Sequence, residues 1–255
     1  MAVVELERRD HIAVVTLNRP EARNAISPEV SQTMVTVLDE IEADPALRAV
    51  VLTGRGEVFS AGADLKVVAQ GKANDIARGK GGFAGIVTRD FPKPIIAAVN
   101  GPALAGGFEI VLSCDLVVAS TEARFGIPEV KRSLVAAAGG LFRLPRALPK
   151  MVAMELALTG DPIDAQRAYE LGFVNRLCEP AALIDTAIAL AEQITANAPL
   201  AVRASRQIVL DGMLAADDDA WRITNEAFAA VASSEDFAEG PRAFIEKRAP
   251  QWKGR

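Results

Sequence analysis

The sequence predicts an α/β fold that is followed by a helical C-terminal region. Short β-branched or apolar runs alternate with helical patterns up to about Ala181. Apolar strands separated by helices are typical of parallel sheets with helical crossovers. From Ala181 onward the chain carries Ala-rich helical patterns without strands. Periodicity leaves open whether the sheet is doubly wound, barrel-like or spiral.

The first elements are a strand and a helix with clear end signals. His11–Leu17 is rich in β-branched residues, which predicts a strand that ends before Pro20. Ser27-Pro28-Glu29 combines an N-cap residue, a proline at the first helical position and an acidic first turn. It predicts a helix that runs to about Ala43. Further strands are predicted at Ala49–Thr53, Ile95–Val99, Leu116–Ala119 and Phe173–Leu177.

The rest of the chain divides into a loop and a helical tail. Gln70–Gly85 is rich in Gly and Lys, which predicts a mobile loop or a frayed helix. The tail can serve as a lid, a dimerisation arm or a second domain. Its predicted helices are Ala181–Asn197, Leu200–Leu210, Asp218–Val231 and Phe237–Lys247.

Composition excludes several classes of protein. The 255 residues include one His and two Cys, Cys114 and Cys178, so the ligands of a His-rich metal site, a zinc site or a dithiol site are lacking. A net charge of −5 argues against a general nucleic-acid binder. The N-terminus has no apolar signal region, and no apolar run is long enough for a membrane span. We expect a cytoplasmic protein with no metal, nucleic-acid or membrane partner.

Two small-residue segments are candidates for backbone binding of an anion. Phe59–Leu65 can form a nest of amides, or it can be a turn in which Asp64 caps a helix. Asn100–Glu109 links a strand end to a helix that begins near Ala105, where free amides meet the positive end of the helix dipole. The segment lacks the glycine spacing of a Rossmann motif and the Lys of a P-loop.

Two carboxylates accompany these turns. Glu109 lies on an otherwise apolar helix, so it is either buried with a raised pKa or a first-turn residue facing water. Glu129 follows Pro128, and the two residues can simply open another helix. Together with the two turns, the pair favours a carboxylate acid–base site. Arg143 and Arg146 lie on a helical pattern and are predicted at a surface or interface.

Eight segments, in order along nearly the whole chain, carry a likeness to a known family. They are Leu17–Ala25, Phe59–Lys66, Pro94–Gly101, Ala105–Glu109, Cys114-Asp115, Ala123–Glu129, Leu158–Gly160 and Phe244–Arg248. By these segments the sequence resembles the enoyl-CoA hydratase/isomerase (crotonase) family. The resemblance implies a spiral of ββα units over residues 1–195 and a helical trimerisation region over 196–255. It also implies a homo-oligomer, either a trimer or a dimer of trimers.

The resemblance assigns the chemistry to two amides and two carboxylates. Ala63 and Gly106 match the family's oxyanion hole, whose N–H groups stabilise the thioester enolate. Glu109 and Glu129 match the two glutamates of the hydratases: the first as base toward water at C3, the second as acid toward C2. The implied reaction is reversible syn-hydration of 2-trans-enoyl-CoA to 3-hydroxyacyl-CoA, in metabolism of the fatty-acid β-oxidation type.

The resemblance also implies how coenzyme A is held. Coenzyme A would be part of the substrate, and no separate cofactor is expected. A backbone turn would contact the adenine, and cations would meet the phosphates, with Lys247 possible from a neighbouring subunit. The positions that match the family's CoA contacts are Glu21, Ala22, Arg23, Ala61, Asp64, Leu65, Lys66 and Lys247.

Departures from the family pattern keep other activities open. Ala136 and Ala137 stand where Pro and Gly are common, and their methyl groups are expected to narrow the acyl pocket. Ile127 replaces a polar residue and leaves Glu129 in apolar company. Alternatives are an enoyl-CoA isomerase or a specialised dehydratase of the carnitinyl-CoA type. A third alternative, from another class, is a CoA-binding scaffold without catalysis.

Overall fold

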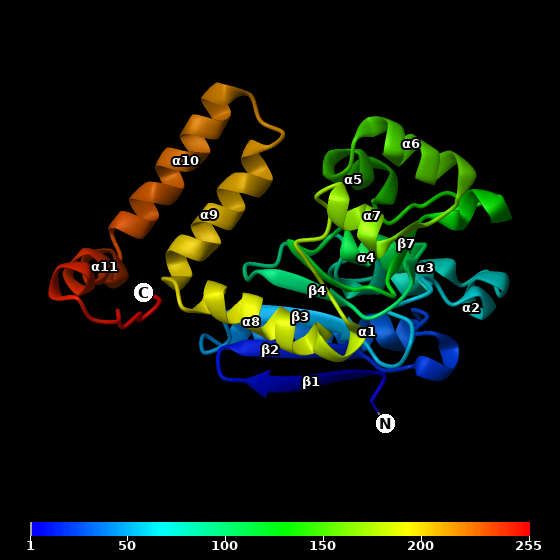
Figure 1. Ribbon diagram of the computed structural model, residues 1–255, viewed down its shortest axis with the longest axis horizontal. Helices are drawn as coiled ribbons and strands as arrows, with labels where there is room; N and C mark the ends of the chain where they lie inside the picture. Colours follow the sequence, from blue (N-terminus) through cyan, green and yellow to red (C-terminus); the bar gives the residue numbers. More distant parts are fainter. Residues whose placement is uncertain (1) are drawn as a thin grey trace.

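The computed structural model describes residues 2–255, which form two sheets surrounded by helices (Figure 1). The large sheet has the order β1-β2-β3-β4-β6-β9, and only its edge pair β1-β2 is antiparallel. The small sheet has the order β5-β7-β8. The strands are β1 (Val4–Arg9), β2 (Ile12–Leu17), β3 (Ala49–Gly54), β4 (Ile95–Val99), β5 (Ala103–Leu104), β6 (Leu116–Ser120), β7 (Arg124–Gly126), β8 (Ile163–Asp164) and β9 (Arg176–Cys178).

The strand order makes the chain advance as a spiral. Each parallel neighbour in the large sheet is the next strand that the chain adds to it, and β5 and β7 branch off after β4 and β6. Every residue of β3 and β4 is buried, as expected for central parallel strands covered on both faces. This strand order agrees with the α/β spiral that the resemblance to the crotonase family implies.

Helices cover both faces of the large sheet. Helix α1 (Pro28–Ala43) begins where the Ser27 side chain accepts the Val30 N–H at 3.3 Å, so the predicted cap is confirmed. Its buried face includes Met34 and Leu38, which pack in the main core. Helix α8 (Leu183–Thr195) covers the opposite face, and its Ala187 packs with Val51 of β3. The small Ala side chains allow the helix to lie close to the sheet.

The other helices lie around this frame. No helix within residues 2–255 is long and apolar enough to cross a membrane. The α-helices are α2 (Leu65–Ala69), α3 (Ala73–Ala77), α4 (Gly106–Val111), α5 (Gly140–Ala147), α6 (Lys150–Thr159), α7 (Ala165–Glu170), α9 (Pro199–Gly212), α10 (Asp217–Ala232) and α11 (Glu235–Glu246). The 3₁₀ helices are η1 (Pro20–Ala22), η2 (Phe83–Gly85), η3 (Pro128–Arg132) and η4 (Pro180–Ala182).

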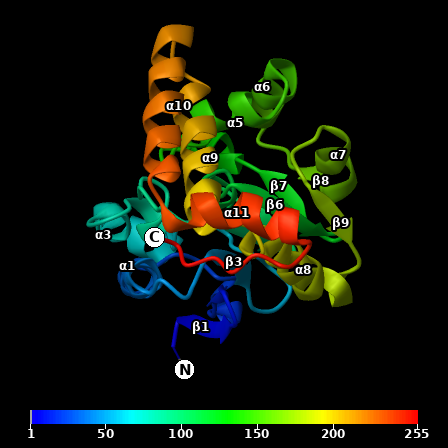
Figure 2. The same ribbon diagram turned by 90° about the vertical axis from the view of Figure 1, so that its left-hand side faces the viewer.

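The helical tail projects from one end of the core (Figures 1 and 2). Helices α9 and α10 pack against each other, and α11 follows α10 and lies next to the C-terminus (Figure 2). Arg206 of α9 anchors the tail, because its Nε donates to the Asp115 carboxylate at 2.9 Å. Trp221 and Phe244 are 66% and 85% exposed, so neither is a core residue of this chain.

Several local predictions needed correction. The N-terminal segment forms β1, which the sequence analysis did not predict. The predicted strand at Phe173–Leu177 begins only at Arg176, because the Phe173 N–H instead donates to the Ala168 carbonyl at the end of α7. The Phe173 ring packs edge-on against Phe108 at 5.5 Å. For the Gln70–Gly85 segment, predicted as a mobile loop or a frayed helix, the helical alternative is present as the short helices α3 and η2.

Candidate active site

Two parallel strands of the small sheet bring the predicted carboxylates together. Leu104 at the end of β5 pairs with Gly126 at the end of β7. Helix α4 follows β5 and carries Glu109, while η3 follows β7 and carries Glu129. Because parallel strands end at the same edge of a sheet, both glutamates lie on neighbouring segments. Both of them line one cavity of about 940 Å³.

Two backbone amides open into the same cavity. A β-bridge between Ser60 and Ala103 joins the predicted small-residue turn to β5. Within residues 2–255 the N–H groups of Ala63 and Gly106 donate to no protein acceptor, and both residues line the cavity. The two turns touch, since a Cβ on Gly62 would lie 2.7 Å from the Gly106 nitrogen. Such a pair of free donors can stabilise a negatively charged oxygen.

A strained backbone conformation at Ala105, just before α4, orients the Gly106 amide. Ala105 adopts φ 53° and ψ −131°, a conformation that is costly for a residue with a Cβ. Its own N–H donates to the Gly126 carbonyl at 2.9 Å, so the contact with β7 holds it in place. Gly106 therefore enters the helix with its N–H unpaired, as the first residues of a helix do.

Glu109 is buried and receives a hydrogen bond. Its side chain is 3% exposed, and Oε1 accepts the Gly140 N–H at 2.8 Å. Burial raises the pKa of the Glu109 carboxyl above its usual value. The backbone groups of Gly140 and Ala138 and the charge of Arg143 act in the opposite direction and favour the ionised form. Of the two alternatives that the sequence leaves open for Glu109, the structure shows the buried one.

Glu129 has a different environment. Burial is the main reason that its pKa rises to about 7, and the charge of Glu109 adds to the rise. Within residues 2–255, its Oε2 is buried and has no hydrogen-bond partner. Ile127, which is 2% exposed, belongs to the apolar core beside this segment. A neutral carboxylic acid is therefore the stable form of Glu129 below about pH 7.

The raised pKa of Glu129 predicts a pH-dependent gain in stability for Glu129→Gln. The unfolded carboxyl titrates near 4.5 and the folded one near 7, so wild type loses stability as pH rises between these values. Since Glu129 is partly exposed, we discount the shift and expect Glu129→Gln to be about 1–2 kcal/mol more stable at pH 8. Urea unfolding at pH 8 and pH 4 measures this.

The gain should vanish at pH 4, where wild-type Glu129 is protonated in both states. Glu122→Gln, at an exposed position, is the matched control and should change stability at neither pH. A gain for Glu129→Gln that is equal at both pH values would contradict the assignment.

The residues predicted to hold coenzyme A are only partly brought together. Arg23, Ala61 and Leu65 line the cavity. Asp64 caps α2 through the Lys66 N–H and pairs with Arg19 at 3.3 Å, so it fixes the turn and does not line the cavity. The side chains of Glu21 and Lys66 are exposed outside the lining, and Ala22 is half-buried outside it. Lys247 ends α11, which lies across the molecule from α2 (Figure 1).

The two alanines that depart from the family pattern have different positions. Ala137 lines the cavity, as the expected narrowing of the pocket requires. Ala136 is 7% exposed and packs in the main core, so its methyl group is not part of the lining.

The prediction for Arg143 was wrong. Its guanidinium is half-buried and lines the cavity because α5 turns this face toward Glu109, whereas Arg146 is exposed as predicted. Phe83 of η2 and Phe142 of α5 also line the cavity and were not predicted. The sequence places Arg143 one helical turn after Gly139. That spacing does not show whether the Arg143 side chain faces the cavity or the solvent.

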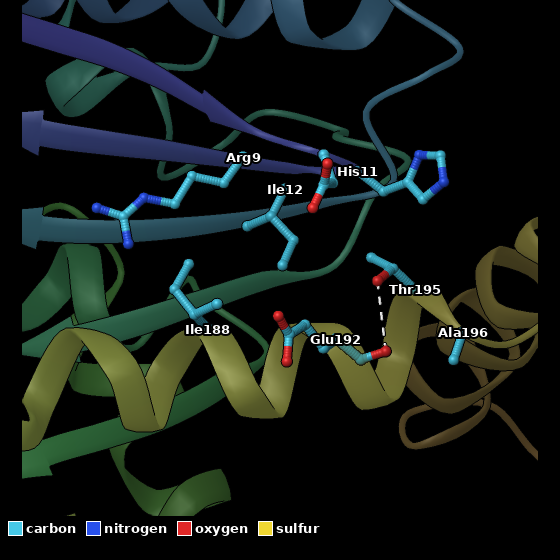
Figure 3. Close-up of a pocket in the computed structure, with 8 residues that line it drawn as sticks. Arg9, His11, Ile12, Ile188, Glu192, Thr195 and Ala196 are labelled. Carbon is cyan, nitrogen blue, oxygen red and sulfur yellow. Dashed lines mark hydrogen bonds between the residues drawn. The ribbon is translucent and has the colours of Figure 1, made fainter.

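A second cavity, of about 510 Å³, lies between the β1–β2 turn and α8 (Figure 3). Arg9 and His11 point away from each other at its rim, and the Thr195 hydroxyl bonds the Glu192 carbonyl at 3.4 Å. His11 Nδ1 is engaged with the Ala46 carbonyl at 2.8 Å. The two carboxylates of this second cavity, Asp10 and Glu192, are both exposed, so we assign the chemistry to the larger cavity, where Glu109 is buried.

Sequence and structure comparisons agree on the class of protein. A sequence model of the enoyl-CoA hydratase/isomerase family matches residues 7–255. A carnitinyl-CoA dehydratase of Citrobacter koseri is 43% identical over 97% of both chains, and one of Escherichia coli K12 is 42% identical over 99% of this chain and 98% of its own.

Solved structures give the same result. An enoyl-CoA hydratase of Mycobacterium tuberculosis H37Rv has a TM-score of 0.95 at 46% identity, covering both chains completely. A carnitinyl-CoA hydratase of Mycobacterium avium has a TM-score of 0.78 at 44% identity, also over both complete chains. The fold and the paired turns and glutamates define a crotonase-type enzyme. The chain belongs to the enoyl-CoA hydratase/isomerase family.

Proposed function

We propose that this enzyme reversibly adds water to a 2-trans-enoyl-CoA to give a 3-hydroxyacyl-CoA. The observation that carries the proposal is the unequal environment of two glutamates in one cavity. Glu109 accepts the Gly140 N–H beside the charge of Arg143, whereas Oε2 of Glu129 is buried without a partner and the pKa of that carboxyl is about 7. Two carboxyl groups whose surroundings differ in hydrogen bonds and nearby charge are suited to act as base and acid on the same substrate.

Each step of hydration then has its group. Glu109 takes a proton from the bound water while the water oxygen forms a bond to C3. The C2–C3 electron pair shifts toward the thioester, and the N–H groups of Ala63 and Gly106 stabilise the enolate oxygen. Glu129 donates its proton to C2, which completes the addition. Proton exchange afterwards restores an ionised Glu109 and a neutral Glu129.

The open side of the cavity is where coenzyme A would enter. Arg23 is an exposed cation in the cavity lining and is suited to its phosphates, and the Ala61–Leu65 turn offers backbone groups to the adenine. Lys247 is remote from α2 within one chain, so its contact would come from a second copy in a homo-oligomer. The exposed Trp221 and Phe244 of the tail are consistent with such an assembly.

A second candidate is dehydration of carnitinyl-CoA, the activity named for relatives at 42–43% identity. It is the same chemistry run in the opposite direction on an acyl group that bears a quaternary ammonium. Aromatic rings bind such cations, and Phe83 and Phe142 line the cavity. However, the guanidinium carbons of Arg143 and Arg146 already lie 5.2 and 5.0 Å from the centroid of the Phe142 ring. Their positive charges repel a further cation at this ring.

A substrate comparison tests both candidates. The enzyme is assayed with crotonyl-CoA, with longer 2-trans-enoyl-CoA thioesters and with crotonyl-CoA carrying a trimethylammonium at C4, and products are identified by mass. Hydration of the uncharged series with higher kcat/KM supports the first candidate. A strong preference for the cationic thioester, or for carnitinyl-CoA in reverse, supports the second.

Other outcomes would overturn both. Conversion of a 3-enoyl-CoA to its 2-enoyl isomer without a hydrated product would identify an isomerase, which needs a proton shuttle and no attacking water. Binding of acyl-CoA without turnover on any of these substrates would identify a scaffold.

A further inference from the structure

Arg143 links the acid–base side of the cavity to the side with the free amides. Its Nη1 donates to the Ala138 carbonyl at 3.2 Å, and its Nη2 donates to the Val87 carbonyl. Val87 follows η2 and its N–H bonds the Phe83 carbonyl at 3.3 Å. The Phe83 ring in turn lies against Gly106, since a Cβ there would be 2.5 Å from the ring. One guanidinium thus joins two walls of the site.

The Gly139-Gly140 pair is shaped around two side chains. A Cβ on Gly139 would lie 2.4 Å from Arg143 Nη1, and a Cβ on Gly140 would lie 3.0 Å from Glu109 Cγ and Oε1. Consecutive glycines therefore let the guanidinium and the carboxylate approach the same stretch of backbone. That backbone also supplies the N–H that Glu109 accepts, so the position of this turn determines the orientation of the carboxylate.

The charge of Arg143 acts on Glu109 as well. The guanidinium favours the ionised carboxylate, and burial of Arg143 lowers its own pKa while the charge of Glu109 raises it. The other titratable groups that act on this pair are Glu129 on η3, Arg146 on α5 and Cys114 beyond α4, while Arg132 on η3 acts on Glu129.

We infer that Arg143 is a positioning residue for hydration: it holds the Ala138–Gly140 turn against Glu109 and supplies the positive charge beside that carboxylate. The inference rests on the proposed role of Glu109 as the base. Arg143 itself need not touch the substrate, because two of its N–H groups are committed to backbone carbonyls.

The test compares three variants through the pH profile of kcat/KM with crotonyl-CoA or the preferred substrate found above. Arg143→Gln removes the charge, Arg143→Lys keeps it, and Arg167→Gln is the control because its exposed guanidinium lies outside the cavity lining and pairs with Glu170 on α7. The acid limb of the profile reports ionisation of the base. We expect Arg143→Gln to move this limb up by about one pH unit and to lower kcat roughly 10–100-fold.

Arg143→Lys should leave the acid limb near its wild-type position while kcat stays reduced, because one ammonium cannot hold both carbonyls in the same geometry. Arg167→Gln should change neither. Thermal unfolding is measured for each variant to check that it folds. If Arg143→Gln does not fold, the test rests on Arg143→Lys, for which we expect an unchanged acid limb together with a reduced kcat. An acid limb that stays in place in Arg143→Gln, or wild-type kcat in Arg143→Lys, overturns the inference. Absence of turnover in wild type overturns the proposed function instead.

Discussion

Glu109→Gln and Glu129→Gln should each lower kcat for hydration by roughly 10²–10⁴-fold, the range that a positioned acid or base contributes. Gln keeps the size of the side chain, so Glu109→Gln removes the proton acceptor and Glu129→Gln removes the proton donor. KM and coenzyme A binding should change little, because neither carboxylate belongs to the predicted CoA-binding residues. Steady-state kinetics and calorimetric titration with the hydrated product measure the two effects separately.

The two variants should differ in their effect on stability, which makes the prediction specific to their environments. Glu129→Gln gains stability at pH 8, as argued above. Glu109→Gln should gain less, because the wild-type carboxylate already accepts the Gly140 N–H at 2.8 Å. Glu122→Gln again serves as the exposed control with unchanged kcat. Near-normal turnover in both active-site variants would refute the carboxylate mechanism.

Gly107→Ala should disable the enzyme without touching either glutamate. A Cβ at Gly107 would lie 2.2 Å from the Ser60 carbonyl oxygen. That carbonyl cannot yield, since it accepts the Leu104 N–H at 3.0 Å and the Ser60 hydroxyl donates to the Asn24 carbonyl at 2.8 Å. Helix α4 must therefore move away from the Ser60 turn, which separates the amides of Ala63 and Gly106.

We expect Gly107→Ala to cost about 1–3 kcal/mol of stability, as overpacking does. Loss of one donor to the enolate should lower kcat by roughly 10²–10³-fold. Gly212→Ala is the matched control, because its nearest neighbour would be the Ala220 Cβ at 3.9 Å and a helical Ala is favoured over Gly. It should be as stable as wild type or slightly more so. Equal kcat in Gly107→Ala and wild type would show that the two amide turns need not be in contact.

Elements with local end signals were predictable from the sequence. The α1 helix has its cap and its proline within three residues, and β3 and β4 are continuous apolar runs, so neighbouring residues suffice to define them. The two-residue strand β5 was not predictable, because it exists only through its pairing with β7. Strand β1 carries charged residues at exposed positions and forms by pairing with β2.

The residues of the candidate site likewise fall into those that the sequence could predict and those that only the structure shows. Glu109, Glu129 and the two small-residue turns were identified from their residue types and their match to a family pattern. The role of Arg143 was missed, since helical periodicity gives no information on which neighbour faces its side chain. The separation of Lys247 from α2 within one chain likewise depends on the direction in which the helical tail leaves the core.

The sequence by itself determined the fold class, the family and the residues that carry the candidate chemistry, because these depend on residue type and order along the chain. Only the tertiary structure decided how the two carboxyl groups differ. Both are glutamates with the same intrinsic pKa. The Gly140 N–H and Arg143 lie beside one of them, whereas the other has one carboxyl oxygen, Oε2 of Glu129, buried without a partner. Desolvation and hydrogen bonding depend on contacts between segments far apart in the chain, and these contacts make one group suited to accept a proton and the other to donate one.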